Sequence, residues 1–463
     1  AFNPPPLVTI KDSYGNTLAS ANSMASGYTI TATLNATSTT TGTMALAGTT
    51  AKTSSGGSAT FSDLKVSGGT GTATLTFTAI VTGDLTQTAV GTAQTTGTYN
   101  VQAGDPDSIA IATNAAGGRA GAAFTTQPVI HIKDVAGNLV QVSPGNDLVI
   151  TASLTGGTGS LVGTTTATAS SSVATFTNLG ISGLTSDTYS ITFTATHSGT
   201  TFTVVQSGIT IGFGAASALS LRTPAASVVN NVAFGTQPVI EVHDVAGNVV
   251  TDSTIQITVA ANRATLGGTA TVAATAGSLT YSGLKLTGTV GDVTLTYSAG
   301  SLGTASQIVS LTHGAATQVS IAVASSLVND TVFATQPVVT IYDQDDNVVT
   351  TGSQSTQTVA LSVSGATTVA ISGSLTMDAA DGVANFTGKG VKLTGLIGAK
   401  SLTATIASPS SITKTETVTI TYGAATKLVI STDAADASNG SAFGTQPVIL
   451  VQDFSGNLVA NST

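Results

Sequence analysis

The sequence predicts an all-β protein built from tandem sandwich domains, and three observations support this prediction. A segment that combines a strand with a turn recurs five times along the 463 residues. Apolar and polar residues alternate with a period of two in several segments of each repeat, as in strands with one buried face. Clusters of Gly, Ser, Thr and Asn interrupt the chain about every 8–12 residues, a spacing typical of sandwiches.

The recurring segment begins with Pro, continues as an apolar-alternating strand and ends in an Asp-x-x-Gly-Asn turn. Its copies are residues 6–16, 128–138, 238–248, 337–347 and 447–457, and Asp346 replaces the Gly in the fourth copy. Successive turn Asp residues are 122, 110, 99 and 110 positions apart. Such a period is too long for a solenoid repeat and matches one small all-β domain.

Three further elements follow the turn in a fixed order within each repeat. Aromatic strands are expected at residues 59–64, 174–179, 279–284 and 384–389, and alternating strands at 74–78, 190–194, 294–298 and 401–405. Short Gly-containing junctions to the next repeat lie at 101–107, 211–217, 311–317 and 420–426. Because the junctions are short, we expect neighbouring domains to touch one another.

This order of elements predicts where the repeats begin and end. The first repeat spans residues 1–102 and lacks the first strand, the next three span 103–213, 214–313 and 314–422, and 423–463 holds only the first strands of a fifth. An incomplete sandwich exposes core residues and unpaired strand edges. Two interpretations follow: the sequence is a window on a longer repetitive chain, or strands are exchanged between subunits so that one copy completes another.

The amino-acid composition limits the kinds of molecule that the protein can bind. Charged residues make up 8% of the chain, against roughly 25% in an average soluble protein, and the net charge is −9. A nucleic-acid partner is excluded because it requires basic patches. No apolar run reaches the roughly 18 residues that a membrane-spanning helix needs. The absence of Cys excludes thiol catalysis and thiolate metal sites.

The Asp-x-x-Gly-Asn turn is the main candidate site. Its simplest interpretation is structural: the Asp carboxylate caps the turn while Gly and Asn accept positive φ angles. The alternative is calcium, for which Asp343, Asp345 and Asn347 match the first three oxygen positions of a calcium loop. Val348 and Gln354 break the remainder of that pattern. We find no motif for catalysis and expect neither an enzyme nor a cofactor site.

The repeats resemble bacterial immunoglobulin-like domains of the tandem type found in invasin- and intimin-like surface proteins. The resemblance covers essentially the whole chain and rests on three motifs: the Gly-Ala-Ala junctions, the Phe-x-Thr-Gln-Pro-Val runs at residues 124–129, 234–239, 333–338 and 443–448, and the Asp-x-x-Gly-Asn turns. It implies Greek-key sandwiches of about seven strands and an extracellular or cell-surface location.

Two functions agree with this resemblance. The first is an extracellular structural protein, a building block of a rod, filament or surface layer (S-layer) whose partners are copies of itself. The second is the stalk of a cell-surface adhesin whose binding domain lies outside this stretch. Uniform repeats and few charges favour the structural protein.

Overall fold

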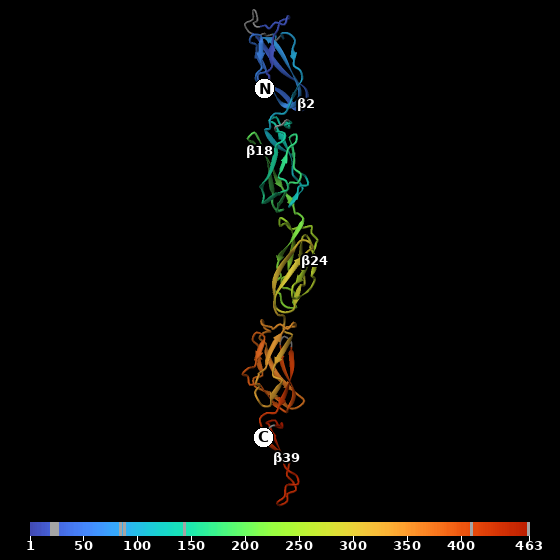
Figure 1. The fold of residues 1–463 in the computed structure, drawn as a ribbon, viewed down its shortest axis with the longest axis vertical. Helices are drawn as coiled ribbons and strands as arrows, with labels where there is room; N and C mark the ends of the chain where they lie inside the picture. The colour runs from blue at the N-terminus through green and yellow to red at the C-terminus, as the bar shows by residue number, and fades with distance from the viewer. Residues whose placement is uncertain (19–26, 83–85, 87–88, 142–144, 408–410, 461–463) are drawn as a thin grey trace. The chain divides into compact units, whose positions relative to one another are not determined.

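The computed structural model describes residues 1–18, 27–82, 86, 89–141, 145–407 and 411–460. Regular structure in these residues consists of β-strands, arranged in successive sandwiches (Figure 1), which confirms the predicted fold class. Contacts divide the chain into two compact units: Ala1–Ala216 with His243–Val250, and Ser217–Val242 with Thr251–Thr463. Within the described part of the chain, no helix is both long and apolar enough to cross a membrane.

The second repeat shows how one sandwich is built from the predicted strands. β11 (Val129–Lys133) pairs with β8 (Ser108–Thr113) on one edge and β15 (Val173–Thr175) on the other. The facing sheet has the order β14-β12-β17-β18, from β14 (Thr166–Thr168), β12 (Val149–Gly156), β17 (Tyr189–His197) and β18 (Thr200–Ile209). The smaller strands are β9 (Gly118–Arg119), β10 (Ala122–Ala123), β13 (Gly159–Val162), β16 (Gly180–Gly183) and β19 (Ile211–Gly212). Alternate apolar side chains of both sheets form one buried core, as period-two patterning requires.

The third repeat has the same two sheets, and in the fourth the larger sheet has a fifth strand. In the third repeat the first sheet has the order β20-β21-β25, from β20 (Ala216–Thr223), β21 (Val239–Asp244) and β25 (Ser278–Thr280). The facing sheet has the order β24-β22-β27-β28, from β24 (Thr271–Ala273), β22 (Gln256–Ala261), β27 (Gly291–Ser298) and β28 (Thr304–Leu311). β23 (Thr265–Gly267) pairs with β26 (Lys285–Thr287). In the fourth repeat the first sheet has the order β29-β31-β35, from β29 (Gln318–Ala322), β31 (Val338–Tyr342) and β35 (Val383–Asn385). The facing sheet has the order β30-β38-β37-β32-β34, from β30 (Ser326–Val328), β38 (Ile412–Thr421), β37 (Gly398–Ile406), β32 (Thr358–Ser364) and β34 (Thr376–Asp378). β33 (Val369–Ser372) pairs with β36 (Lys392–Gly395).

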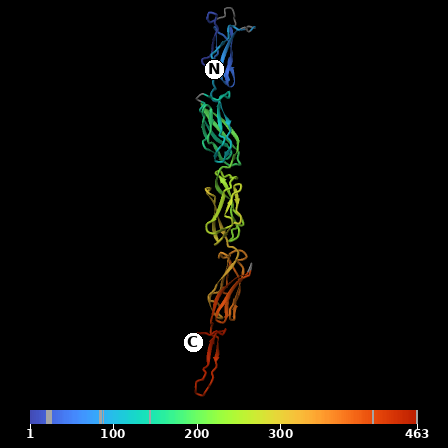
Figure 2. The ribbon, with the colours of Figure 1, turned by 90° about the vertical axis from the view of Figure 1, so that its right-hand side faces the viewer.

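The first repeat and the C-terminal segment contain fewer strands. The first has β1 (Leu7–Thr9), β2 (Tyr28–Ala47), β3 (Ala51–Thr53), β4 (Ser58–Thr60), β5 (Lys65–Val81), β6 (Gln94–Thr95) and β7 (Tyr99–Val101). The C-terminal segment has β39 (Lys427–Thr432) and β40 (Val448–Gln452), which form a two-stranded antiparallel sheet (Figure 2, red). The predicted boundaries between repeats stay a prediction.

The Gln of each Phe-x-Thr-Gln-Pro run has a structural role. Gln127 Nε2 donates to Phe124 O (2.8 Å) and Leu179 O (3.1 Å), while its Oε1 accepts from Leu179 N–H (2.9 Å). Gln237 and Gln336 make the same three kinds of bond in the next two repeats. One amide side chain thus satisfies backbone groups of two segments, next to the backbone bond from Phe124 N–H to Leu179 O.

A tyrosine pair in the third repeat yields a stability prediction. Tyr281 and Tyr297 pack with ring centroids 5.9 Å apart, where the second repeat has Phe176 and Phe193. Tyr281 Oη donates to Ile257 O (2.9 Å), but the buried Tyr297 hydroxyl has no hydrogen-bond partner among the residues that the structure describes. Burying an unpaired hydroxyl is costly. We therefore expect Tyr297→Phe to raise the free energy of unfolding of this repeat by about 1 kcal/mol.

Tyr281→Phe is the matched control for this substitution, because it removes a hydroxyl that is bonded. It should lower the free energy of unfolding by about 1 kcal/mol, since the Ile257 carbonyl loses its buried partner. Hydrogen exchange of the β22 and β27 amides in both variants measures the two effects. Equal destabilisation by the two substitutions would contradict the assignment of Tyr297 as unpartnered.

Candidate functional site: the turns at the junctions between repeats

Each Asp-x-x-Gly-Asn turn is held by its own Asp. In the second copy, Asp134 Oδ1 accepts from the N–H groups of Ala136 (3.0 Å) and Asn138 (2.8 Å). Gly137 has a φ of 85°, which glycine adopts without strain, and Asp346 occupies this position in the fourth copy with a φ of 61°. The capping role that the sequence predicts for the Asp is therefore present.

The second carboxylate oxygen of the Asp binds the junction that leads into the same repeat. Asp343 Oδ2 accepts from Gly314 N–H at 2.8 Å. The equivalent bonds join Asp134 to Gly104, Asp244 to Gly214 and Asp453 to Gly423, at 2.9, 2.7 and 2.9 Å. The Gly of each predicted junction thus donates to the turn Asp about 30 residues further along the chain.

The Asn of the turn reaches the preceding repeat. Asn347 Nδ2 donates to Gly288 O (3.0 Å), and Asn347 Oδ1 accepts from Val290 N–H (2.8 Å). The same two bonds join Asn248 to Gly183 and Thr185, and Asn457 to Gly395 and Ile397. Asn138 bonds Gly68 O and the Thr41 hydroxyl. We call these four turns, residues 134–138, 244–248, 343–347 and 453–457, the junction turns; each forms its contacts within one compact unit.

Two junction turns receive a further bond from the preceding repeat. Asn230 Nδ2 donates to Asp343 Oδ2 (2.8 Å) and Asp345 Oδ2 (2.7 Å), and its Oδ1 accepts from Gly288 N–H (3.0 Å). Asn329 does the same for Asp453, with Ser455 in place of the second Asp. Both Asn residues stand four positions before the Phe of their Phe-x-Thr-Gln-Pro run, where the second repeat has Ala120.

The turn carboxylates are buried and remain ionised. Burial alone raises the pKa of Asp343, which is 1% exposed, but the hydrogen bonds from Gly314, Asn347 and Asn230 outweigh burial and lower the pKa to about 2. Asp453 has a pKa of about 2 for the same reasons. In Asp134 and Asp244 the balance between burial and hydrogen bonding also lowers the pKa.

The structure brings the three calcium candidates together. Asp343 Oδ2 and Asp345 Oδ2 both face the amide of Asn230, and Asn347 Nδ2 also donates to Asp343. Amide N–H groups therefore occupy the positions around these oxygens that a cation would need. His, Asp and Glu side chains form no group of three suited to a metal among the described residues.

The calcium hypothesis is tested by adding millimolar calcium to metal-free protein. Because Asn230 already bonds both carboxylates, we expect the unfolding temperature to stay unchanged. A rise that Asp345→Asn abolishes would instead establish an ion site at Asp343, Asp345 and Asn347. Magnesium is the control for unspecific effects of divalent ions.

A substitution of the Asn tests its bonds to the preceding repeat. Asn347→Ala should leave Gly288 O and Val290 N–H without their partner and cost about 2 kcal/mol. The local measurement is hydrogen exchange at Val290, which should become faster. Asn16→Ala is the matched control, since the bonds of exposed Asn16 within the described residues stay inside its own turn. Equal effects of both substitutions would contradict a role for Asn347 beyond its own turn.

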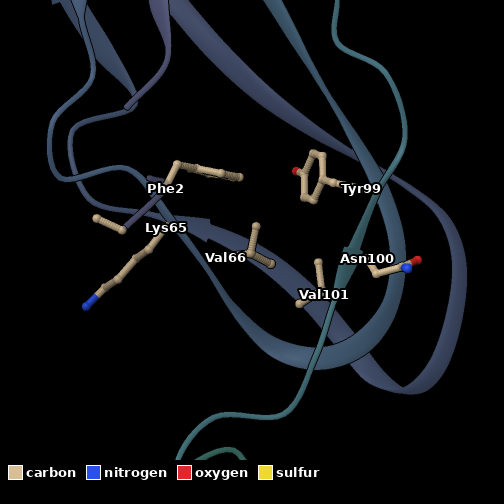
Figure 3. Close-up of a pocket in the computed structure, with 7 residues that line it drawn as sticks. Phe2, Lys65, Val66, Tyr99, Asn100 and Val101 are labelled. Atoms are coloured by element: carbon tan, nitrogen blue, oxygen red, sulfur yellow. The ribbon is translucent and has the colours of Figure 1, made fainter. Parts of the chain in front are cut away.

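A small hollow in the first repeat offers little chemistry. It measures about 190 Å³ and is lined by Phe2, Val66, Tyr99 and Val101 together with Ala1, Lys65 and Asn100. Figure 3 shows the Phe2 and Tyr99 side chains pointing toward each other across it, while Lys65 points away. The two rings lie edge to face, with a centroid distance of 5.4 Å. Its lining is mostly apolar and is typical of packing between strands.

Comparisons with known proteins give only distant similarities. No family model matches the chain, and a search of curated proteins finds no match. Among solved structures, the Escherichia coli adhesin FdeC is 14% identical, over 69% of this chain and 100% of that one, with a TM-score of 0.26. A protocadherin gammaB7 fragment is 12% identical, over 90% and 95%, with a TM-score of 0.32. A β-glycosidase from Bacteroides vulgatus is 12% identical, over 45% and 25%, with a TM-score of 0.20. We base no functional inference on similarities this low.

The sequence predicted the position of the turns but not their contacts. Asn230 and Asn329 were missed altogether, because a single Asn in a loop carries no periodic signal. Their shared position, four residues before the Phe of the recurring run, is the one signal that could have identified them.

Proposed function

We propose that the chain is an extracellular structural protein, a rod, filament or surface-layer building block in which each repeat is a separate immunoglobulin-like domain. The observation that carries this proposal is the set of junction turns. In each, a buried Asn bonds the preceding repeat, and a buried Asp holds the turn and bonds the junction Gly. Buried, fully bonded polar groups stabilise one local arrangement of the turn and its partners, which suits a structural protein.

The low content of charged residues, 8% of the chain, supports the same function. Exposed strand faces carry Thr hydroxyls that bond each other across strands, as in the pairs Thr155–Thr192 and Thr403–Thr415. Such neutral faces repel one another weakly, so copies of the chain can lie close together. The extracellular location rests on the resemblance to bacterial surface domains.

The adhesin stalk is the second candidate, because junction turns would hold a terminal binding domain at a distance equally well. The two functions differ in whether the chain assembles with copies of itself. We propose no catalytic role, since the polar side chains that the junctions bring together are engaged in bonds to one another and to the backbone.

Immunogold electron microscopy of intact cells, with antibodies against the third and fourth repeats, tests the proposal. We expect label on the cell exterior, on ordered assemblies such as filaments or a lattice. Label on isolated surface projections would favour the stalk. Label confined to the cell interior would refute both.

A further inference from the structure

Five Asn-x-Ser/Thr triplets occur in the sequence, and the structure gives their side chains different surroundings. Such a triplet is the acceptor sequence for an N-linked sugar when its middle residue is not Pro. The triplets begin at Asn35, Asn329, Asn385, Asn439 and Asn461, the last of which lies outside the described residues. Many such triplets arise by chance in a chain rich in Thr and Ser, so the surroundings of each Asn must select among them.

Two of the triplets have their Asn engaged in bonds of the fold. Asn329 is 2% exposed, and its Nδ2 donates to Asp453 and Ser455. Asn35 is exposed, but its Nδ2 donates to Thr76 Oγ1 at 2.7 Å. An N-linked sugar is attached to Nδ2, so an amide nitrogen that is buried or already bonded is a poor acceptor.

The triplet at Asn385 leaves its amide nitrogen available. Asn385 is exposed at the end of β35, and its Oδ1 accepts from Thr387 N–H (2.9 Å) and from the Thr387 hydroxyl (2.6 Å). Because an N–H group faces the amide oxygen, Nδ2 points the other way, and it donates no hydrogen bond within the described residues. Asn439 is exposed too, but in the described structure its amide oxygen accepts no bond from Ser441.

The middle residue of the triplet fixes this arrangement. Phe386 is fully buried in the core of the fourth repeat, and its N–H donates to Pro337 O at 3.0 Å. Residues on either side of a buried residue in an extended chain point to the opposite face, so Asn385 and Thr387 both stand on the outside. The triplet is therefore held at the surface with its two reacting side chains already in contact.

From this geometry we infer that Asn385 is the acceptor of an N-linked sugar. Because such sugars are carried by secreted chains, this assignment rests on the extracellular location in the proposed function. Nδ2 forms a bond to the anomeric carbon of a sugar whose donor is a lipid-linked sugar phosphate. The bond from that carbon to the phosphate oxygen breaks, the phosphate keeps the electron pair, and one Nδ2 proton passes to a base of the transferase. The two bonds from Thr387 stabilise the charge that Oδ1 gains as the amide loses this proton.

The first three repeats have Thr where the fourth has Asn385. These equivalent residues are Thr60, Thr175 and Thr280, and each precedes a buried aromatic residue. In the described structure β35 pairs with β31 alone and is an edge strand. A sugar is bulky and polar, so at Asn385 it shields this edge from pairing with another strand.

Mass spectrometry of peptides from the full chain, purified from the cells that produce it, tests the assignment. We expect a sugar on Asn385, located by electron-transfer fragmentation, and none on Asn329, which the fold buries. Thr387→Val should abolish the modification and Thr387→Ser should retain it, because only the second keeps the hydroxyl. Asn385→Thr installs the residue of the other repeats and is the folded, unmodified control. Circular dichroism should be the same for all three variants.

Three results would each overturn the assignment: an unmodified Asn385 in the native chain, modification that persists in Thr387→Val, or a sugar on Asn329. The last would mean that the transferase acts before the chain folds, so that the folded surroundings of a triplet do not select it. Surface label on cells would leave the proposed function standing in all three cases, whereas label confined to the interior would refute the proposed function itself.

Discussion

Replacing Asp343 with alanine should lower the free energy of unfolding of the fourth repeat by about 3 kcal/mol or more. The carboxylate accepts from Gly314 N–H, from the N–H groups of Asp345 and Asn347, and from the side chains of Asn230 and Asn347. Each buried donor that loses its partner costs about 1–3 kcal/mol, because water does not readily replace the carboxylate. The loss should exceed that at a turn alone because this carboxylate bonds its turn, the junction and the preceding repeat.

Asp12→Ala is the matched control for Asp343→Ala. It removes the same cap from an exposed turn whose Asp bonds, in the described part of the chain, lie within the turn, so its cost should stay near the roughly 1 kcal/mol of an ordinary cap. Hydrogen exchange resolved by peptide measures both substitutions in the full chain, where separate repeats need not unfold together. Similar losses at Asp12 and Asp343 would show that the turn alone, and not its junction, determines the stability.

The fold could be predicted from the sequence because the buried faces are regular. In strands such as β17, every second residue points into the core, so alternation identifies both the strand and its buried face. The recurrence of Asp134, Asp244, Asp343 and Asp453 then gave the length of the repeat. A turn residue is equally visible, since the Gly at a positive φ and the capping Asp follow local rules.

The contacts of the junction turns could not be predicted in the same way. Asn347 pairs with Gly288 and Val290, nearly 60 residues away, and no local rule relates such positions. The amide of Asn230 is 113 residues from Asp343. The sequence supports two uses for an Asp and an Asn at one turn, hydrogen bonding or an ion site, and the choice depends on which donors tertiary packing brings to the carboxylate.

Acid should weaken the junctions at Asp343 and Asp453 before it weakens the cores. Both carboxyls have a folded-state pKa of about 2, below the ordinary pKa of 3.8 that an Asp has in the unfolded chain. The unfolded state therefore binds protons first as the pH falls, and stability decreases from about pH 4 to about pH 2. At about 1.4 kcal/mol for each tenfold change in proton affinity, each carboxyl contributes about 2 kcal/mol above that range.

The groups around each carboxyl determine how this pH dependence is measured. Asp345 and Asp346 lie beside Asp343, whereas Ser455 and Gly456 stand at these positions beside Asp453. Asp453 therefore has no acidic neighbour within its own turn, although the carboxyl of Asp330 interacts with it electrostatically. Hydrogen exchange at Ile397, whose N–H donates to Asn457, should accelerate between pH 4 and pH 2 after correction for intrinsic exchange. Asp453→Asn should remove most of that dependence while leaving the exchange at Val290 unchanged. If Asp453→Asn retained the full pH dependence of exchange at Ile397, a group other than Asp453 would be responsible for the acid sensitivity of this junction.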